Sequence, residues 1–289
     1  MAEQKAQVII IGGGPAGVSA ALYLARAGVR TTIIENGPGA LARAHKIDNY
    51  YGIAASGARL YAAGLEQAEA LGVSIRQDEV LSVEYTDSFT LSLKTTAEQL
   101  SAPALILATG TKNITLNLPG LVQLEGKGIS YCAVCDGFFF RKKQVAVLGS
   151  GAYALHEAAY LRHLAQSVTI LTNGQSGEAA QSAGFDVKDA KLVQLNGDSR
   201  LTGISFDDGS TLEVDGLFIA MGTADSTDIA RKLGAQTNGR FIKIDADGKT
   251  NIPGLFAAGD CTGGLLQVSK AVHEGAQAGL AALNFIRSK

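Results

Sequence analysis

A strand, a glycine-rich turn, a helix and a second strand follow one another twice in this chain of 289 residues. The first copy runs from the apolar stretch Val8 to Ile11, through an alanine- and leucine-rich segment, to a second apolar stretch that ends at Glu35. The second copy is KKQVAVLGSGAYALHEAAYLRHLAQSVTILTNG, residues 142–174. Each copy has the order and the roughly 30-residue length of a βαβ unit. The repeat predicts an α/β fold with parallel sheets.

The length of the chain agrees with two domains, since one domain usually has roughly 100–200 residues. The last strand and the alanine-rich helix from about Leu266 resemble the missing end of the first βαβ domain. We therefore predict two Rossmann-like dinucleotide-binding domains, with the second inserted in the first. The expected boundaries are 1–113 and 243–289 for the first domain and 114–242 for the second.

The first glycine turn follows a strand and opens a helix, which is the context that dinucleotide binding requires. The first glycine permits a tight turn, the second lets a pyrophosphate approach the N-terminus of the helix, and the third lets helix and strand pack closely. Glu35, at the end of the second strand, can accept hydrogen bonds from a ribose. The alternative is a tight turn without a ligand. The candidate residues of this motif are Gly12, Gly14, Pro15, Ala16, Gly17 and Glu35.

The composition excludes several function classes. With 25 basic and 27 acidic residues, the net charge is −2, so no basic excess indicates a nucleic-acid partner. No apolar run approaches the roughly 20 residues of a membrane span. The N-terminus enters a strand almost at once, which leaves no room for a signal peptide. We expect a cytoplasmic protein.

Two of the three cysteines stand in the segment Cys132-x-x-Cys135, between the two glycine-turn units. A zinc site needs four ligands, usually with a second pair at compatible spacing. Only Cys261 and four scattered histidines remain, so we expect no metal site. A permanent structural disulfide would close a very short loop and stabilise little. A redox pair fits best, because such thiols often have lowered pKa values and exchange with other disulfides.

The residues directly after the cysteine pair leave two alternatives each. Asp136 is a candidate proton donor or acceptor for the pair; alternatively, it forms an Asp-Gly turn with Gly137. The next three residues are Phe138, Phe139 and Phe140. We expect these phenylalanines to pack in the core or at a hinge, and a partner-docking surface is the alternative.

Three segments resemble FAD-binding motifs of the pyridine-nucleotide-disulfide reductase superfamily. TNIPGLFAAGD, residues 250–260, is similar to the second such motif, whose aspartate contacts the ribityl chain. ATGT, residues 108–111, resembles the accompanying turn, and KIDNYYG, residues 46–52, resembles the loop beside the flavin. The last helix would turn its N-terminus to the flavin pyrimidine ring and stabilise the reduced anion; the alternative is a plain helix start. By this resemblance, the further FAD-binding residues are Asn49, Val80, Thr109, Gly110, Gly259, Asp260, Gln267 and Val268.

With Cys-x-x-Cys-Asp in the second domain, the whole chain resembles the low-molecular-weight thioredoxin reductases. The resemblance implies a homodimer with one FAD in the first domain of each chain. It also implies that Cys132 and Cys135 carry electrons to the disulfide of a thioredoxin-like protein. Cys135 would lie nearer to the flavin and Cys132 would attack the partner. The family rotates its second domain about two linkers, here near 111–117 and 239–245.

The second glycine unit departs from the pattern of NADPH-dependent relatives, which carry a basic cluster after the next strand for the 2′-phosphate. Thr172, Asn173 and Gly174 occupy those positions, and the next charge, Glu178, is negative. Binding a doubly charged phosphate without a cation is costly. The acid that would suit NAD at this strand end is also absent. We therefore do not expect NADPH to bind to this degenerate NAD(P)H-type site.

The chain most resembles the ferredoxin-dependent flavin thioredoxin reductases, which implies ferredoxin or flavodoxin as the electron donor. Three other enzymes remain as alternatives. They are an NADPH-dependent reductase that holds the phosphate by other residues, a disulfide oxidoreductase with a second FAD in the second glycine site, and a flavin dithiol oxidase. A flavin-bearing redox sensor or binding module without turnover is the alternative that is not an enzyme.

Overall fold

The structure is a computed structural model that describes residues 6–86, 90–110, 116–222, 226–239 and 241–289. The chain forms two compact units, of which the first comprises Met1–Lys112 and Asp225–Lys289 and the second Asn113–Ala224. The second unit is therefore inserted in the first, and the predicted fold class is confirmed. None of the helices in the described ranges has the length and hydropathy that crossing a bilayer requires.

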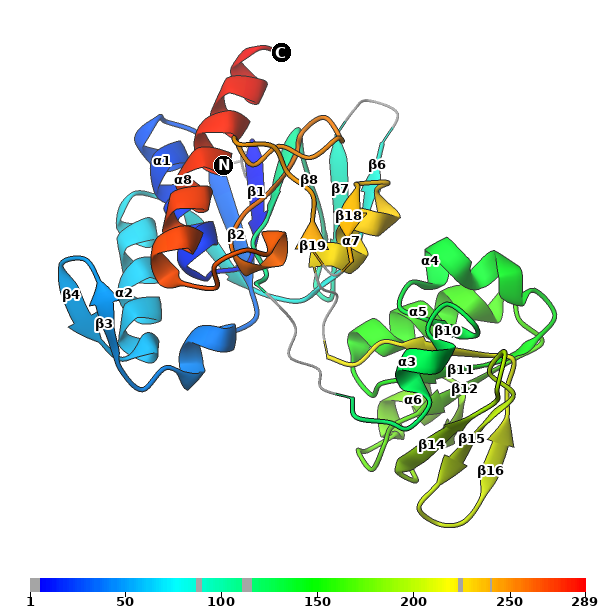
Figure 1. The fold of residues 1–289 in the computed structure, drawn as a ribbon. Helices are drawn as coiled ribbons and strands as arrows, with labels where there is room; N and C mark the ends of the chain where they lie inside the picture. Colours follow the sequence, from blue (N-terminus) through cyan, green and yellow to red (C-terminus); the bar gives the residue numbers. More distant parts are fainter. Residues whose placement is uncertain (1–5, 87–89, 111–115, 223–225, 240) are drawn as a thin grey trace. The chain divides into compact units, whose positions relative to one another are not determined.

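Five parallel strands form the central sheet of the first unit (Figure 1). In spatial order they are β20 (Leu255–Ala257), β9 (Ala104–Leu107), β1 (Val8–Ile11), β2 (Thr31–Glu35) and β5 (Ser74–Gln77). All residues of β1 and β9 are buried and apolar, as expected for central strands covered on both faces. Ile11 pairs with Ile34 in β2 and with Leu107 in β9. The residues that follow these three strands therefore meet at one edge of the sheet.

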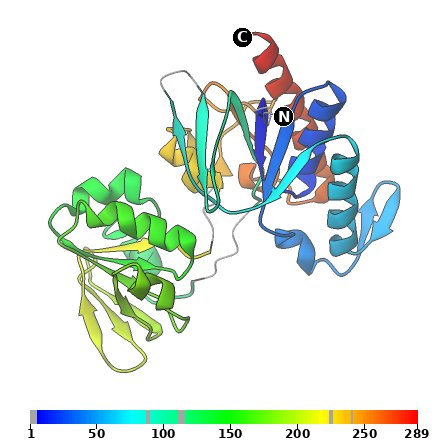
Figure 2. The ribbon, with the colours of Figure 1, turned by 180° about the vertical axis from the view of Figure 1, so that it is seen from behind.

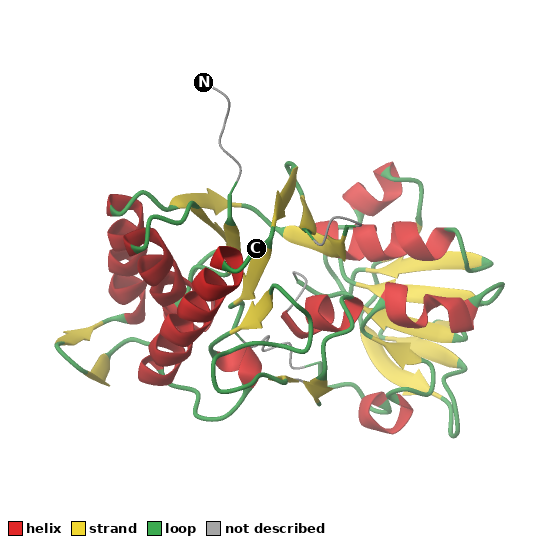
Figure 3. Ribbon diagram, turned by 90° about the horizontal axis from the view of Figure 1, so that it is seen from above, coloured by secondary structure: helices red, strands yellow, loops and turns green. Residues whose placement is uncertain are grey.

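Three helices of the first unit lie side by side (Figure 3). They are α1 (Pro15–Arg26), α2 (Gly57–Ala70) and α8 (Val268–Arg287). Small residues let α8 approach α1 closely, because a Cβ on Gly275 would lie 2.1 Å from the carbonyl oxygen of Ala16. A Cβ on Gly279 would lie 2.8 Å from the carbonyl oxygen of Ala20. The last helix thus completes the first domain, as predicted.

The remaining elements of the first unit are short. A three-stranded antiparallel sheet, seen from behind in Figure 2, contains β6 (Val80–Tyr85), β7 (Leu91–Thr95) and β8 (Gln99–Ala102). The two hairpins are β3 (Ile47–Tyr50) with β4 (Ile53–Ala55) and β18 (Thr237–Asn238) with β19 (Phe241–Ile242). The short helices are η1 (Gly39–Arg43), α7 (Ser226–Lys232) and η3 (Asp260–Thr262).

The second crossing between the units differs from the expected boundary at residue 242. It lies at 224/225, because α7 and the β18–β19 hairpin pack within the first unit. In particular, α7 contacts β6 and β19 contacts η3. The linker expected near 111–117 lies largely outside the described residues, and the stretch 239–245 belongs to the first unit.

The second unit also has a five-stranded parallel sheet, but the edge strand that corresponds to β20 precedes the other strands in sequence. Its parallel sheet has the order β10 (Ile129–Ser130), β17 (Gly216–Ile219), β11 (Gln144–Leu148), β12 (Ser167–Leu171) and β13 (Asp186–Lys188). An antiparallel sheet contains β14 (Leu192–Asn196), β15 (Gly203–Phe206) and β16 (Thr211–Glu213). The helices are α3 (Leu121–Leu124), α4 (Ala133–Asp136), η2 (Gly137–Phe140), α5 (Ala152–Arg162) and α6 (Glu178–Ser182). The two copies of the βαβ unit that the sequence predicts are β1–α1–β2 and β11–α5–β12.

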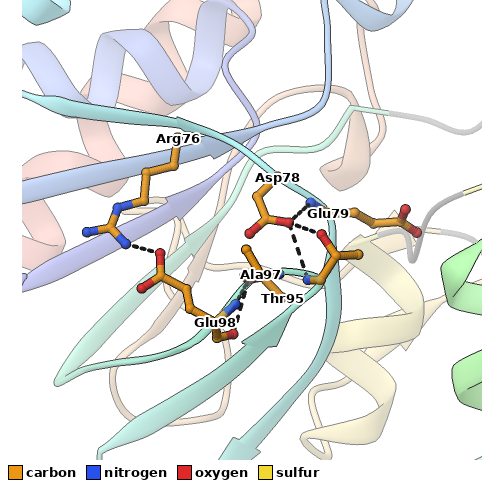
Figure 4. A network of polar contacts seen from close by, with 7 residues as sticks. Arg76, Asp78, Glu79, Thr95, Ala97 and Glu98 are labelled. Atoms are coloured by element: carbon orange, nitrogen blue, oxygen red, sulfur yellow. Dashed lines mark hydrogen bonds and ion pairs between the residues drawn. The ribbon is translucent and has the colours of Figure 1, made fainter.

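A polar network fixes the turn between β5 and β6 (Figure 4). The Oδ1 atom of Asp78 accepts hydrogen bonds from the backbone N–H groups of Glu79 at 2.7 Å and Thr96 at 3.2 Å, and from the Thr96 hydroxyl. Burial would raise the pKa of Asp78, but hydrogen bonds from Thr95, Thr96 and the backbone of Glu79 and Ala97 outweigh burial. The pKa of Asp78 therefore lies below its usual value.

Replacing Asp78 by alanine is expected to lower the free energy of unfolding by roughly 1 kcal/mol at neutral pH, because several donors lose one acceptor. A lowered pKa in the folded state stabilises the fold above the unfolded-state pKa of about 3.9, and this contribution is lost as the pH falls through the folded-state pKa. The measurement is urea unfolding of both proteins between neutral pH and the acid range. Asp48→Ala is the control, since the exposed pair of Asp48 with Lys46 contributes little. A difference between wild type and Asp78→Ala that stays constant down to acid pH would contradict this account.

Candidate active site

The first glycine turn lies at the carboxyl edge of the first sheet and requires its glycines. Gly12 has a φ of +114°, and a Cβ there would lie 2.3 Å from the carbonyl oxygen of Ala108. A Cβ on Gly17 would lie 1.9 Å from the carbonyl oxygen of Gly12. These contacts bring strand, turn and helix together as the motif predicts.

The N-terminus of α1 fits the pyrophosphate of a dinucleotide. Gly14 is its N-cap residue, no side chain caps it, and Pro15 begins the helix. A Cβ on Gly14 would meet no atom within 4 Å, so this side of the turn is open. Backbone N–H groups at such an end bind anionic groups. Ala16 is buried beneath the turn, and a Cβ on Gly259 would lie 2.9 Å from its Cβ.

Glu35 is buried at the end of β2, one strand away from the glycine turn. Its Oε2 atom accepts hydrogen bonds from the Gly37 N–H at 2.6 Å and from the Tyr61 hydroxyl. Burial raises the pKa of Tyr61, and the hydrogen bond to Glu35 and the charge of Glu35 raise it further. Tyr61 therefore stays a hydrogen-bond donor and holds the carboxylate at the strand edge, where a ribose would reach it.

Thr109 follows β9 and forms a reciprocal pair with Ser226 at the start of α7. The two hydroxyl oxygens lie 2.6 Å apart, and the Ser226 N–H donates to the Thr109 hydroxyl at 3.0 Å. Gly110 follows with a φ of +71°. The chain leaves the first unit after β9 and returns to it at α7. The hydrogen bonds between Thr109 and Ser226 hold these two points together.

Asp260 lies in the turn after β20, and two side chains of α8 hold this turn. Lys270 Nζ donates to the carbonyl oxygen of Gly259 at 2.7 Å and forms an ion pair with Glu274 at 2.9 Å. Glu274 Oε2 accepts from the Gly259 N–H at 2.8 Å and from the Thr262 hydroxyl at 2.8 Å. Burial raises the pKa of Asp260, while Lys270 lowers it and Glu274 raises it.

The structure brings together two of the remaining flavin candidates, which are far apart in sequence. The Asn49 side-chain amide donates to Gln267 Oε1 at 3.0 Å. Gln267 is the N-cap of α8 and Val268 its first residue, so the helix starts where the sequence predicts. Val80 is buried at the start of β6, where its side chain is part of the core.

The second unit carries a disulfide between Cys132 and Cys135. Cys132 is buried and Cys135 is exposed. The Cys135 N–H donates to Cys132 Sγ at 3.1 Å. Across the described residues, no three His, Cys, Asp or Glu side chains converge as metal ligands.

Three side chains surround this disulfide turn. Ser130, at the end of β10, donates to Asp136 Oδ2 at 2.6 Å and accepts from the Cys132 N–H at 3.1 Å. Glu157 of α5 is buried and accepts from the Ala133 N–H at 2.8 Å. The predicted candidate Asp136 is therefore linked through Ser130 to the backbone of Cys132.

We expected the three phenylalanines in the core or at a hinge, and two of them do not lie in the core. Phe138 and Phe139 are 67% and 69% exposed. Only Phe140 packs inward, with its ring centroid 5.2 Å from that of Phe218. A 3₁₀ turn points successive side chains in different directions, so one residue of the three reaches the sheet.

The end of β12, where a pyridine nucleotide would bind, carries different residues from the end of β2, where Glu35 lies. Thr172 is buried and donates to Asp189 Oδ1 at 2.9 Å. Asn173 adopts a φ of +54°, and its side chain accepts from the first backbone N–H of β14. The aliphatic chain of Lys191 covers Gly174, since its Cε would lie 3.0 Å from a Cβ there. One carboxylate and one ammonium group thus reach this strand end from the connection after β13.

Several of these residues were missed at the level of sequence. The Lys270–Glu274 pair has the spacing of an i,i+4 ion pair on a predicted helix, which was an available signal. The other missed residues form hydrogen bonds to segments that are neighbours only in the folded chain or across a turn; they are Ser130, Glu157, Ser226 and Asp189. Isolated polar residues of this kind give no periodic pattern in the sequence. These contacts depend on which strand ends and helix faces become neighbours.

A family described as pyridine nucleotide-disulphide oxidoreductase matches residues 6–275, which include the glycine turns of both units, the disulfide and the Asp260 turn. The chain belongs to this family. Its members among curated relatives include the thioredoxin reductase of Streptomyces coelicolor, 35% identical over 88% of this chain and 85% of the relative. The thioredoxin reductase of Listeria monocytogenes is 34% identical over 98% of this chain and 95% of the relative.

Solved structures of the family are similar to this chain over almost its full length. An atypical thioredoxin reductase from Desulfovibrio vulgaris Hildenborough has a TM-score of 0.92 and 42% identity, covering 99% of both chains. A ferredoxin-flavin thioredoxin reductase from Clostridium acetobutylicum has a TM-score of 0.73 and 29% identity, also covering 99% of both. As a member of this family, the protein is a flavoprotein disulfide oxidoreductase of the thioredoxin reductase type.

Proposed function

We propose that this protein is an FAD-dependent disulfide reductase that passes electrons through Cys132 and Cys135 to a thioredoxin-like protein. We further propose that ferredoxin or flavodoxin, rather than NADPH, supplies the electrons. The thioredoxin partner is inferred from the similarity to the thioredoxin reductases of Streptomyces and Listeria. The ferredoxin donor is inferred from the similarity to the ferredoxin-flavin thioredoxin reductase of Clostridium. By the same resemblance, we expect a homodimer.

The assignment of the electron donor rests on the charges at the strand end that carries Thr172. A 2′-phosphate has close to two negative charges at neutral pH. The Asp189 carboxylate and the Lys191 ammonium at this strand end provide no net positive charge. Removing a phosphate from water without compensating cations is unfavourable. NADPH therefore gains little from this site compared with a nucleotide that lacks the phosphate.

The first unit supplies the residues that would hold FAD. The N-terminus of α1 at Gly14 would bind the pyrophosphate and Glu35 the adenosine ribose. The turn held by Lys270 and Glu274 presents Asp260, which would contact the ribityl chain. When bound, FAD supplies the two-electron carrier that reduces the disulfide of the second unit.

The second unit supplies the dithiol chemistry. After reduction, the thiolate of Cys132 attacks a sulfur of the partner disulfide and forms a mixed disulfide, releasing one partner thiolate. The Cys135 thiolate then attacks Cys132, which restores the Cys132–Cys135 bond and releases the second partner thiol. Asp136 moves the proton between the enzyme thiols and the departing thiolate. Cys132 is buried in the disulfide form, so its attack requires that the turn open after reduction.

A second candidate, an NADPH-dependent reductase, is favoured by Lys191 alone. Its aliphatic chain lies over Gly174, so its ammonium group would be available to a 2′-phosphate at this strand end. If this candidate is correct, Lys191→Met lowers the apparent affinity for NADPH and leaves turnover with ferredoxin unchanged.

The test is steady-state reduction of an oxidised thioredoxin by the purified holoenzyme, with reduced ferredoxin, NADPH or NADH as the donor. We expect rapid thioredoxin reduction with ferredoxin and at most a background rate with either nucleotide. A rate with NADPH that equals or exceeds the rate with ferredoxin would refute the donor assignment. Absence of thioredoxin reduction with every donor would refute the partner assignment.

A further inference from the structure

Ser130 occupies a position that the predicted dithiol chemistry does not yet use. It is the last residue of β10 and is only 3% exposed. Its hydroxyl oxygen accepts the Cys132 N–H at 3.1 Å. Two acceptors compete for its single proton, Asp136 Oδ2 at 2.6 Å and the Cys132 carbonyl oxygen at 3.3 Å.

The shorter of these two contacts decides where the hydroxyl proton lies. A separation of 2.6 Å is typical of a hydroxyl that donates to an ionised carboxylate, and such bonds are stronger than neutral ones. The longer contact to a neutral carbonyl is weaker. The bonds therefore run from the Cys132 N–H to the Ser130 oxygen, and from the Ser130 hydroxyl to Asp136.

We propose that Ser130 is a positioning residue that holds the Asp136 carboxylate against the turn of Cys132 and thereby sets the rate of disulfide opening and closure. The inference rests on the role of Asp136 in the proposed function. Ser130 is buried, and its hydroxyl bonds the backbone of Cys132 and the carboxylate of Asp136, so its proposed effect on the rate is exerted through Asp136.

Other hydrogen bonds also hold the Cys132–Cys135 turn. The effect of Ser130 on Asp136 can therefore be measured separately from the stability of the turn. Glu157 holds the Ala133 N–H from the side of α5, and the Asp136 N–H donates to the Cys132 carbonyl oxygen at 3.1 Å. These bonds remain when the Ser130 hydroxyl is removed. Ser130→Ala should therefore keep the turn and free the carboxylate of Asp136 to rotate away.

The test uses the opening of the disulfide by dithiothreitol in the anaerobic holoenzyme. One dithiothreitol thiol gives its proton to the Asp136 carboxylate and attacks a sulfur of the Cys132–Cys135 bond. The other cysteine leaves as a thiolate and takes this proton from Asp136. The second dithiothreitol thiol then closes the cyclic disulfide and completes the reduction to the enzyme dithiol. Rapid alkylation with iodoacetamide and mass spectrometry measure the fraction of reduced enzyme, without any need for ferredoxin or thioredoxin.

We expect Ser130→Ala to slow disulfide opening about tenfold, a part of the 10²–10⁴ that a positioned acid or base contributes. Ser130→Thr, which restores the hydroxyl, should recover the rate. Ser205→Ala is the matched control, since Ser205 accepts a side-chain hydrogen bond from Asn196 within the same unit. Its rate should equal that of wild type, and thermal melting of each variant checks that the fold is kept.

The double variant decides between positioning and a purely structural role. In the Asp136→Asn background, Ser130→Ala should cause no further loss, because the residue acts only through Asp136. An unchanged rate in Ser130→Ala, or the same tenfold loss in both backgrounds, would overturn the inference. If Asp136→Asn alone changes nothing, the role of Asp136 fails and this inference fails with it. A failed ferredoxin or thioredoxin assay concerns only the proposed function.

Discussion

Replacing Cys135 by serine is expected to abolish disulfide reduction while leaving the fold and the flavin content unchanged. Without Cys135, the enzyme can neither form its internal disulfide nor release a mixed disulfide on Cys132. Loss of a covalent catalytic group lowers turnover by about four orders of magnitude or more. The measurement is thioredoxin reduction by the variant, with the visible flavin spectrum as the check on cofactor content. Turnover within tenfold of wild type would show that the pair is not on the electron path.

The third cysteine offers the matched control. Cys261 is buried, and burial raises the pKa of its thiol to about 12, so it is not a nucleophile at neutral pH. Its sulfur lies 3.3 Å from the carbonyl oxygen of Ala258 in the turn after β20. Cys261→Ser should keep disulfide reduction near the wild-type rate.

In the Cys132→Ser variant, the exposed Cys135 should react rapidly with iodoacetamide.

Replacing Gly17 by alanine is expected to destabilise the first unit by about 3 kcal/mol, the upper range for overpacking a tight contact. The new Cβ would lie 1.9 Å from the carbonyl oxygen of Gly12, so the turn or α1 must shift. The shift separates the helix N-terminus from the sheet edge that carries Glu35, and flavin binding should fall with it. The measurement is urea unfolding of the protein without flavin, followed by titration with FAD.

Gly14→Ala separates the contribution of this turn to stability from its contribution to binding. Gly14 has a φ of −75°, and its Cβ would meet no protein atom within 4 Å. The fold should therefore be as stable as wild type without flavin. The added methyl group would occupy the open side of the turn, so the affinity for FAD should decrease clearly. Equal FAD affinity in Gly14→Ala and wild type would contradict the placement of the pyrophosphate at this turn.

Local signals in the sequence are sufficient to predict much of the fold. Strands such as β1 and β9 are continuous apolar runs, and the glycine turns differ from other turns by their spacing between strand and helix. The division at 224/225 has no local signal in the sequence, because the short α7 and the two-residue strands β18 and β19 have no periodic pattern of their own. Their membership in the first unit depends on long-range packing against β6 and η3.

The candidate site shows the same difference between residues that a local motif predicts and residues that only the fold brings together. Gly12, Gly17 and Glu35 belong to a motif whose spacing carries physical meaning, and the structure places them at one sheet edge. Ser130 lies only six residues before Asp136, and Lys270 only ten after Asp260, but both contacts depend on how the turns between these residues fold. A short polar contact of this kind has no counterpart in hydrophobic periodicity, so sequence reasoning alone does not find it.

The central claim is that the flavin of this enzyme accepts electrons from an iron–sulfur protein or flavodoxin and not from NADPH. The most direct measurement is an anaerobic titration of the holoenzyme, followed by the visible absorbance of its flavin. FAD and the Cys132–Cys135 disulfide together take four electrons per chain, two each. Our account predicts that reduced ferredoxin bleaches the flavin once it has supplied these four electrons, and that NADPH or NADH supplying as many electrons does not. Prompt bleaching by NADPH at the same number of electron equivalents would contradict the claim and would assign the phosphate to the strand end at Thr172 and Lys191.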